Sequence, residues 1–330
     1  MKLGSLKAGG RDGTLVVVDS SLERAVTVPE ISGTLQHALE TWDALASKLE
    51  SVYLSLNAGE IKGAFGLEMQ AMGSPLPRSY QFLDGSAYLA HVERVRKARG
   101  AEMPPSFLTD PLMYQAVSDG FLGPVDPISA ASEESGIDFE SEVGVIVDDV
   151  PMGIAPADVD KHIKLLVLIN DVSLRNLIPA ELGKGFGFLA SKPRSALSPV
   201  AVTPDEFGPA WRDGKIHRPL ITHLNGKLFG EPDCGVDMQF SFHDLVAHAA
   251  QTRRLAAGTL IGSGTIANHD ESKGSSCLAE RRVLEIIKTG EASTPFMSFG
   301  DRVRIEMTDD DGKDVFGAIE QVIERYSGPA

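Results

Sequence analysis

Two glutamates open the segment of this chain that is richest in possible chemistry. Glu140 and Glu142 stand at the start of residues 138–147, which continue as an apolar run, and a second apolar run, 164–170, ends at Asp171. Side chains at i and i+2 of a strand share a face, so the two carboxylates are expected to point the same way. Two like charges so close repel each other unless a cation lies between them. With Asp171 they would form an all-oxygen, anionic pocket, which suits Mg, Ca or Mn rather than Zn.

The same alternation is also typical of a strand face in contact with solvent. Asp171 favours the metal site, because a carboxylate that closes a Leu/Val/Ile run lies where a buried strand emerges. A charge in that position is costly unless it is paired or bound to a metal. The pattern alone leaves both interpretations open.

Three further groups could contribute to a site. Arg175, four residues after Asp171, could clamp a substrate carboxylate or simply pair with a neighbouring acid. The segment 260–266 predicts a strand that enters a turn at Gly264 and Thr265, where backbone amides could approach a ligand oxygen. His91, on a predicted helix, is a candidate general base, although a single helical histidine is usually structural.

The elements that must position these groups fall into two parts. We predict a small N-terminal α/β domain over 1–75, with a strand at 14–19 and a helical pattern from 34 to 49, because the pattern breaks at 73–78. Residues 76–330 are expected to form a second domain, with a helix over 88–99 that ends at Gly100 and another over 242–257. Tight turns at 212–215, 224–227 and 310–313 predict hairpins, and hence an antiparallel or mixed β core.

Composition bounds the choice of partners. The 330 residues carry 46 acidic and 31 basic side chains, a net charge of -15, which argues against nucleic acid or an anionic membrane and still permits a small anionic substrate. Cys234 and Cys277 are too few for a disulfide framework, so we expect a reducing, cytoplasmic setting. We expect no signal peptide and no membrane span.

Four motifs in order resemble the fumarylacetoacetate hydrolase superfamily, over roughly residues 80 to 325. They are Thr109-Asp110, Glu140-x-Glu142, Asn170-Asp171-x-Ser173-x-Arg175 and Ser263-Gly264-Thr265. The resemblance implies an α+β fold, in which a mixed β-sandwich roll carries the catalytic site beside a small N-terminal domain, and it implies a homodimer.

The resemblance also implies a site. A divalent metal, with Mg as the first choice and Mn or Ca as alternatives, would be held by Glu140, Glu142 and Asp171, with Asp110 completing the set. The substrate-binding residues would be Tyr114, Arg175, Gly264 and Thr265. The family lysine that stabilises the departing enolate is assigned to Lys192, twenty-one residues after Asp171, in preference to Lys184.

Three departures concern the catalytic base and the substrate. Long members carry a histidine seven residues after the Asp, where counting from Asp110 gives Val117. Short members carry His-x-x-Glu on a helix, whereas here the acid, Glu93, comes two residues after His91, and i and i+2 do not share a helix face. We therefore expect Glu280 to supply the acid. Ile178 replaces a family glutamine.

These residues predict a metal-dependent hydrolase that cleaves a carbon-carbon bond in a fumarylacetoacetate-like or acylpyruvate diketo acid. His91 would activate water. One alternative keeps the site but makes the protein a hydratase, decarboxylase or isomerase of a 2-oxo acid. The other is a metal-binding family member without catalysis.

Overall fold

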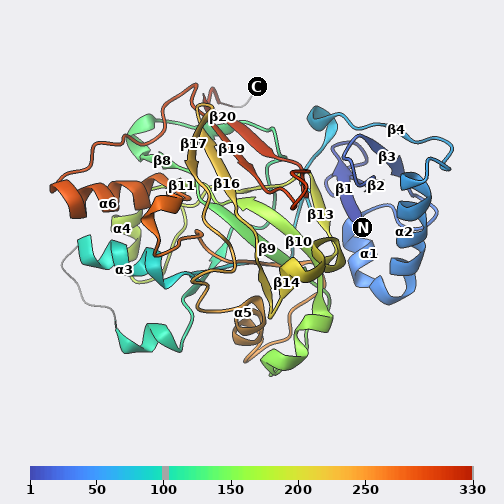
Figure 1. The fold of residues 1–330 in the computed structure, drawn as a ribbon, viewed down its shortest axis with the longest axis horizontal. Helices are drawn as coiled ribbons and strands as arrows, with labels where there is room; N and C mark the ends of the chain where they lie inside the picture. Colours follow the sequence, from blue (N-terminus) through green and yellow to red (C-terminus); the bar gives the residue numbers. More distant parts are fainter. Residues whose placement is uncertain (99–103, 329–330) are drawn as a thin grey trace.

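The computed structural model describes residues 1–98 and 104–328, which form a mixed α+β fold around two large β-sheets, with two further two-stranded sheets (Figure 1). The strands are β1 Lys2–Leu6, β2 Thr14–Val18, β3 Arg24–Thr27, β4 Phe65–Gly66, β5 Phe82–Gly85, β6 Met113–Ala116, β7 Ile128–Ala130, β8 Ile137–Asp138, β9 Ser141–Val147, β10 Ile163–Asn170, β11 Ser173–Leu174, β12 Ala196–Leu197, β13 Val200–Val202, β14 Trp211–Arg212, β15 Lys215–Ile216, β16 Ile221–Leu224, β17 Lys227–Gly230, β18 Thr259–Gly262, β19 Arg302–Glu306 and β20 Ile319–Arg325. The α-helices are α1 Leu35–Glu40, α2 Trp42–Asn57, α3 Leu89–Ala98, α4 Ile178–Leu182, α5 Phe242–Ala249 and α6 Leu278–Thr289. The two-stranded sheets are β11-β8 and β14-β15.

The larger sheet runs through the whole molecule. Its order is β4-β3-β2-β1-β13-β10-β9-β18-β5-β6, with β12 also paired to β10. Most neighbours are antiparallel, and β18 and β5 are parallel. The smaller sheet, β17-β16-β19-β20-β7, packs beside it, and Thr222 of β16 donates a hydrogen bond to Ser141 of β9 over 2.8 Å. The predicted β core with few long helices is what the chain forms.

Alternation along the central strands builds two cores, one on each face of the larger sheet. Val143, Val145, Leu166 and Leu168 pack into one core. Ile146, Leu165, Val167 and Ile169 pack into the other, together with apolar residues of α1 and α2. Because successive side chains of a strand point to opposite faces, strands that are buried on both sides read as nearly continuous apolar runs.

The N-terminal part shares this sheet, since β1 pairs with β13 through Lys2, Leu3 and Gly4. The proposed division at residue 75 falls in the connection between β4 and β5. The predicted helical pattern of 34–49 is divided into α1 and α2 at Thr41, whose hydroxyl donates to the carbonyl of His37 over 2.8 Å.

The other predicted elements are found with shifted ends. Helix 88–99 appears as α3, and its predicted end at Arg99 and Gly100 lies outside the described residues. The helix over 242–257 is too long, because α5 stops at Ala249 and Leu255 instead exchanges two backbone hydrogen bonds with Val150. The hairpin turns at 213–214 and 225–226 form as predicted, with positive φ at both central residues of each.

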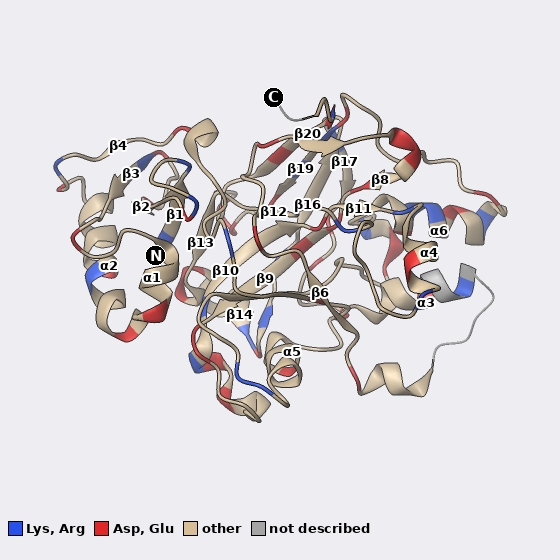
Figure 2. Ribbon diagram, turned by 180° about the vertical axis from the view of Figure 1, so that it is seen from behind, with Lys and Arg blue, Asp and Glu red and all other residues tan. Residues whose placement is uncertain are grey.

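Both acidic and basic residues are found on the N-terminal part and on the rest of the chain (Figure 2). Among the described residues, no helix combines the length and the apolar character that a membrane crossing requires.

Candidate active site

Three buried carboxylates meet at one end of the larger sheet. Asp84, Glu142 and Asp171 each place an oxygen within 4.8 Å of the others. Each carboxylate lies an even number of residues from an apolar residue of the same core, and side chains at even spacing in a strand share a face of the sheet. Asp84 stands two residues after Phe82, Asp171 two after Ile169, and Glu142 four before Ile146. The site therefore lies where the core beneath α1 and α2 ends.

A glycine in the intervening strand leaves room for these side chains. Gly262 of β18 is the register partner of Asp84 on one side and of Gly144, two residues from Glu142, on the other. A Cβ at Gly262 would lie 2.3 Å from Oδ1 of Asp84 and 3.2 Å from Oε2 of Glu142. Any other residue would fill the space between the carboxylates.

Neither carboxylate oxygen of Glu142 accepts a hydrogen bond from a donor among the described residues. Its close neighbour is Asp84, a second carboxylate, which can only share a proton with it. Burial, and then the charge of Asp171, raises the pKa of Asp84 to about 8. Burial, and then Asp84, raises the pKa of Glu142 well above its ordinary value. In the absence of a cation, burial and mutual repulsion therefore favour a protonated carboxyl group within this pair.

Asp171, in contrast, is surrounded by donors. Tyr114 and Lys192 both donate to its Oδ2 over 2.6 Å, and Ser195 donates to its Oδ1 over 2.6 Å. Lys192 also donates to Oε2 of Glu140 over 2.6 Å. Burial opposes the charge of this lysine, yet Asp171 and Glu140 raise its pKa, which keeps it an ammonium ion.

Glu140 lies beside the three carboxylates and forms ion pairs with two basic side chains, Arg175 and Lys192. Arg175 donates from its Nη2 to Glu140 over 2.6 Å and from its Nε to Asp138 over 2.7 Å. Although burial opposes it, Arg175 and Lys192 lower the pKa of Glu140. The expected pair Glu140 and Glu142 thus divides: Glu142 belongs to the group of three, and Glu140 faces Lys192 and Arg175. The sequence left two roles open for Arg175, and the structure shows the ion pair with neighbouring acids.

Asp110 does not join this group, which corrects the expectation drawn from the Thr109-Asp110 dipeptide. Its side chain is 71% exposed and lies 3.7 Å from His248 of α5. Asp110 follows a short 3₁₀ helix on the surface, whereas the third carboxylate of the group comes from β5.

Asp84 was missed, although two signals were present. The run Phe82-Leu83-Asp84-Gly85 is a short apolar strand closed by an acid, as 164–171 is. Asp84 also precedes His91 by seven residues, so a count of seven from Asp84 ends at a histidine, whereas the same count from Asp110 ends at Val117.

A pocket of about 170 Å³ collects most of the residues singled out from the sequence. His91, Tyr114, Arg175, Lys192, Gly264 and Thr265 all line it, with Asp84 and Glu140. The backbone amide of Gly264 donates to Asp84 over 3.1 Å. Gly264 has φ +75, and a Cβ there would lie 2.2 Å from the carbonyl oxygen of Gly85, so a side chain is excluded. Ile178 and Phe188 supply an apolar wall.

The remaining candidates lie around this pocket. Lys184 is exposed, whereas Lys192 is buried against Glu140 and Asp171. Glu93 is on the outer side of α3, 4.0 Å from the exposed His269. Glu280, fully buried in the first turn of α6, forms an ion pair with Arg94 and does not line the pocket.

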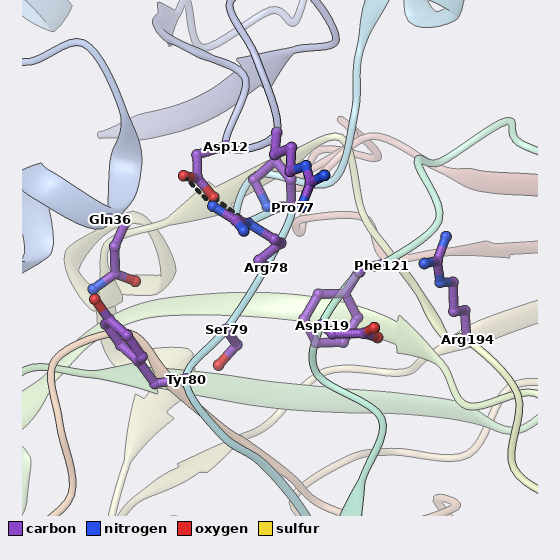
Figure 3. A pocket seen from close by; sticks show the side chains of 11 residues that line it. Asp12, Gln36, Pro77, Arg78, Ser79, Tyr80, Asp119, Phe121 and Arg194 are labelled. Carbon is purple, nitrogen blue, oxygen red and sulfur yellow. Dashed lines mark hydrogen bonds and ion pairs between the residues drawn. The ribbon is translucent and has the colours of Figure 1, made fainter.

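A larger pocket of about 780 Å³ lies between the N-terminal part and residues 77–80, 119–121 and 194 (Figure 3). Its most evident polar feature is Arg78, which donates to both oxygens of Asp12 over 2.8 and 2.7 Å. None of the predicted site residues lines it.

The three carboxylates fit a hard divalent cation. The donors are oxygen atoms alone, Glu142 has no other partner, and Gly262 leaves the space open. Mg, Mn and Ca prefer such ligands.

Comparison with known proteins places this arrangement in a family. The family model for the fumarylacetoacetate hydrolase C-terminal domain matches residues 81–324, and the model for fumarylacetoacetase N-terminal domain 2 matches residues 1–78. A comparison with curated protein sequences gave no match.

Solved structures share the fold at low sequence identity. One from Mycobacterium smegmatis, provisionally described as an HpcE protein, is 20% identical, with a TM-score of 0.71 over 99% of this chain and 100% of that chain. A 5-carboxymethyl-2-hydroxymuconate delta-isomerase from the same organism is 17% identical, with a TM-score of 0.62 over 99% and 100%. The maleylpyruvate hydrolase of Sphingobium sp. SYK-6, solved with manganese(II) and pyruvate, is 15% identical, with a TM-score of 0.64 over 98% and 99%.

These structures confirm the expected α+β fold with its N-terminal domain. Because the C-terminal model covers well over half of the chain, the protein belongs to the fumarylacetoacetate hydrolase family.

Proposed function

We propose that this protein is a metal-dependent hydrolase that cleaves a carbon-carbon bond in an acylpyruvate or fumarylacetoacetate-like diketo acid. The observation that carries the proposal is the unpartnered Glu142, buried beside Asp84 and Asp171 next to a pocket lined by His91 and Lys192. Burying a carboxylate without a donor is costly, and a divalent cation would remove that cost.

Asp84, Glu142 and Asp171 are the proposed ligands, with Glu140 as a further candidate. The cation is proposed to be Mg, with Mn as an alternative because the related maleylpyruvate hydrolase was solved with manganese. When bound, such a cation stabilises the negative charge that develops on the oxygens of a diketo acid.

The side chains of the pocket have separate tasks in this proposal. His91 takes a proton from water, whose oxygen forms a bond to the acyl carbonyl carbon. The bond from that carbon to the pyruvyl carbon then breaks, and its electron pair remains on the pyruvyl fragment as an enolate. Lys192 and Tyr114 stabilise the enolate oxygen by charge and hydrogen bonding. Protonation of the enolate carbon, by the proton that His91 took from water, completes the reaction. One acylpyruvate and one water thus give a carboxylic acid and pyruvate, and a fumarylacetoacetate-like substrate would give a carboxylic acid and a 3-oxo acid in the same way.

A second candidate keeps the same pocket and isomerises a 2-oxo acid by moving a proton. The structural relative described as a delta-isomerase supports it. The two reactions differ in their products, because isomerisation consumes no water and releases no carboxylic acid.

Product analysis tests the proposal. The purified protein, with Mg or Mn, is incubated with a panel of acylpyruvates, fumarylacetoacetate-like diketo acids and 2-oxo acids, and the products are identified. With the acylpyruvates, release of pyruvate is followed by a coupled reduction. We expect pyruvate and one carboxylic acid in equal amounts, and loss of turnover with retained metal binding in His91→Gln. Conversion without a carboxylic acid would favour the isomerase. If the unmodified protein converts no diketo or 2-oxo acid, the non-catalytic alternative holds.

We also propose that the protein forms a homodimer, as its resemblance to the family implies. Light scattering would then give twice the chain mass of 35.3 kDa, and a mass of one chain would refute it.

A further inference from the structure

Arg94 is a buried cation that the proposed reaction does not use. It lies on α3, three residues after His91, and is only 9% exposed. Its Nη1 donates to Oε1 of Glu280 over 2.5 Å, and its Nη2 donates to the backbone carbonyl of Asn268 over 2.6 Å. The guanidinium therefore connects α3 to the first turn of α6, which lies beside it (Figure 1), and to the segment at 268.

The ion pair with Arg94 engages only one of the two carboxylate oxygens of Glu280. Glu280 is fully buried, and its second oxygen, Oε2, has no hydrogen-bond partner among the described residues. Nδ1 of His91 is likewise buried without a partner. Unpaired buried polar atoms are rare and costly, so two of them in neighbouring side chains call for an explanation.

His91 and Glu280 are electrostatic neighbours. Burial lowers the pKa of His91, and among the charged groups around it Glu280 acts most strongly, ahead of Glu140, Arg175 and Arg94. Helix α3 provides no other acid for His91, because Glu93 lies near the exposed His269. Residues i and i+3 share a helix face, so His91 lies on the same face of α3 as Arg94, whose guanidinium pairs with Glu280 of α6.

We propose that Arg94 is a positioning residue, which fixes Oε1 of Glu280 and thereby presents Oε2 to Nδ1 of His91. Nδ1 then donates to the carboxylate, and Nε2 is left as the atom that accepts a proton in the pocket. A carboxylate behind an imidazole fixes both its tautomer and its orientation. The role of His91 in turnover rests on the proposed function, whereas the proposed hydrogen bond between His91 and Glu280 does not.

The simpler alternative is that Arg94 only clamps two helices together. Arg282 provides a matched control for that role. It stands on α6, as Glu280 does, donates to the backbone carbonyl of Thr294 and lies over the ring of Phe296 at 4.4 Å. Arg282→Met removes an anchored arginine from α6 without touching Glu280.

Nitrogen NMR of the His91 imidazole separates the two roles without any substrate. The His91 signals are assigned by their loss in His91→Gln. We expect a protonated, hydrogen-bonded Nδ1 in the unmodified protein, its loss in Arg94→Met and Glu280→Leu, and its retention in Arg94→Lys and Arg282→Met. If Arg94→Met does not fold, Arg94→Gln replaces it with the same expected loss. Retention of the signal in the folded Arg94 variant would overturn the proposal.

Kinetics provide a second readout once a substrate is known. We expect Arg94→Met to lower kcat by about 10- to 100-fold, the usual effect of losing a residue that orients another, with KM and metal affinity unchanged. A fall in metal affinity equal to that in kcat would contradict the positioning role. Absence of turnover in the unmodified protein would instead sink the proposed function, and the NMR result would stand alone.

Discussion

At the scale of single residues, the site is defined by which carboxylates have donors and which have none. Asp171 and Glu140 are held by Lys192, Tyr114, Ser195 and Arg175, so their charges are balanced within the chain. Glu142 and Asp84 lie close together without a cationic side chain to balance their charges. Asp84 accepts a hydrogen bond from the backbone amide of Gly264, and Glu142 accepts none from the described residues. These two residues are where a cation is needed.

Exchange of Asp84 for Asn tests this assignment. The variant keeps the shape of the side chain but removes one anionic ligand, so we expect Mn affinity, measured by calorimetry, to fall by more than about 100-fold, beyond the usual effect of a merely supporting residue. Asp110→Asn is the matched control, and its affinity should be unchanged. Equal effects of the two substitutions, or an effect of Asp110→Asn alone, would restore Asp110 to the site.

Metal affinity should also depend on pH. Burial and Asp171 raise the pKa of Asp84 to about 8, so the metal-free protein holds a proton there that the cation must displace. Affinity should therefore rise with pH up to about 8, by about tenfold per pH unit for each displaced proton, and then level off. Calorimetry in buffers of different ionisation enthalpy counts the released protons. No proton release at pH 7 would show that these carboxylates are not the ligands.

At the scale of the elements, strand order and register bring together residues that are far apart in the sequence. Asp84 and Gly264 are 180 residues apart, and they meet because β5 and β18 are parallel neighbours. The strands around Glu142 and Asp171 could be predicted because each is long and apolar and has an acid at one end. β5 has only four residues and its partner comes late in the chain, so its pairing left no local pattern. The Thr109-Asp110 dipeptide is too short to carry information about the position of Asp110 in the fold.

Gly262 offers an element-scale test. Gly262→Ala places a methyl group between Asp84 and Glu142, and it should lower Mn affinity by at least about 10- to 100-fold, the range seen when the support of a ligand is disturbed. Gly66→Ala, in a strand where a Cβ meets no atom within 4 Å, is the control. Unchanged affinity in Gly262→Ala, measured on folded protein, would place the cation elsewhere.

At the scale of the whole molecule, one sheet and one core join the two parts of the chain. Leu15, Leu35 and Leu49 pack in the same cluster as Ile146 and Val167, and β1 pairs with β13. The two expected domains were predictable from the break at 73–78, but this continuity was not, because it depends on pairing between strands about 200 residues apart.

Removal of residues 1–75 should therefore uncover the edge of β13 and the apolar face beneath α1 and α2. We expect the remaining chain, 76–330, to aggregate or to bind a hydrophobic dye, and to lose the metal site at the end of that face. Gel filtration and dye fluorescence against the full chain measure this. A monodisperse chain 76–330 with unchanged Mn affinity would show that the division at residue 75 separates two independent folding units.

The central claim is that a divalent cation lies between Asp84, Glu142 and Asp171. Anomalous diffraction at the manganese absorption edge, from crystals of the protein grown with Mn, tests it most directly. The account predicts one anomalous peak within bonding distance of an oxygen of each of these three residues, with Asp110 remote from it. A peak at another site, or none at Mn concentrations that saturate binding in solution, would contradict it.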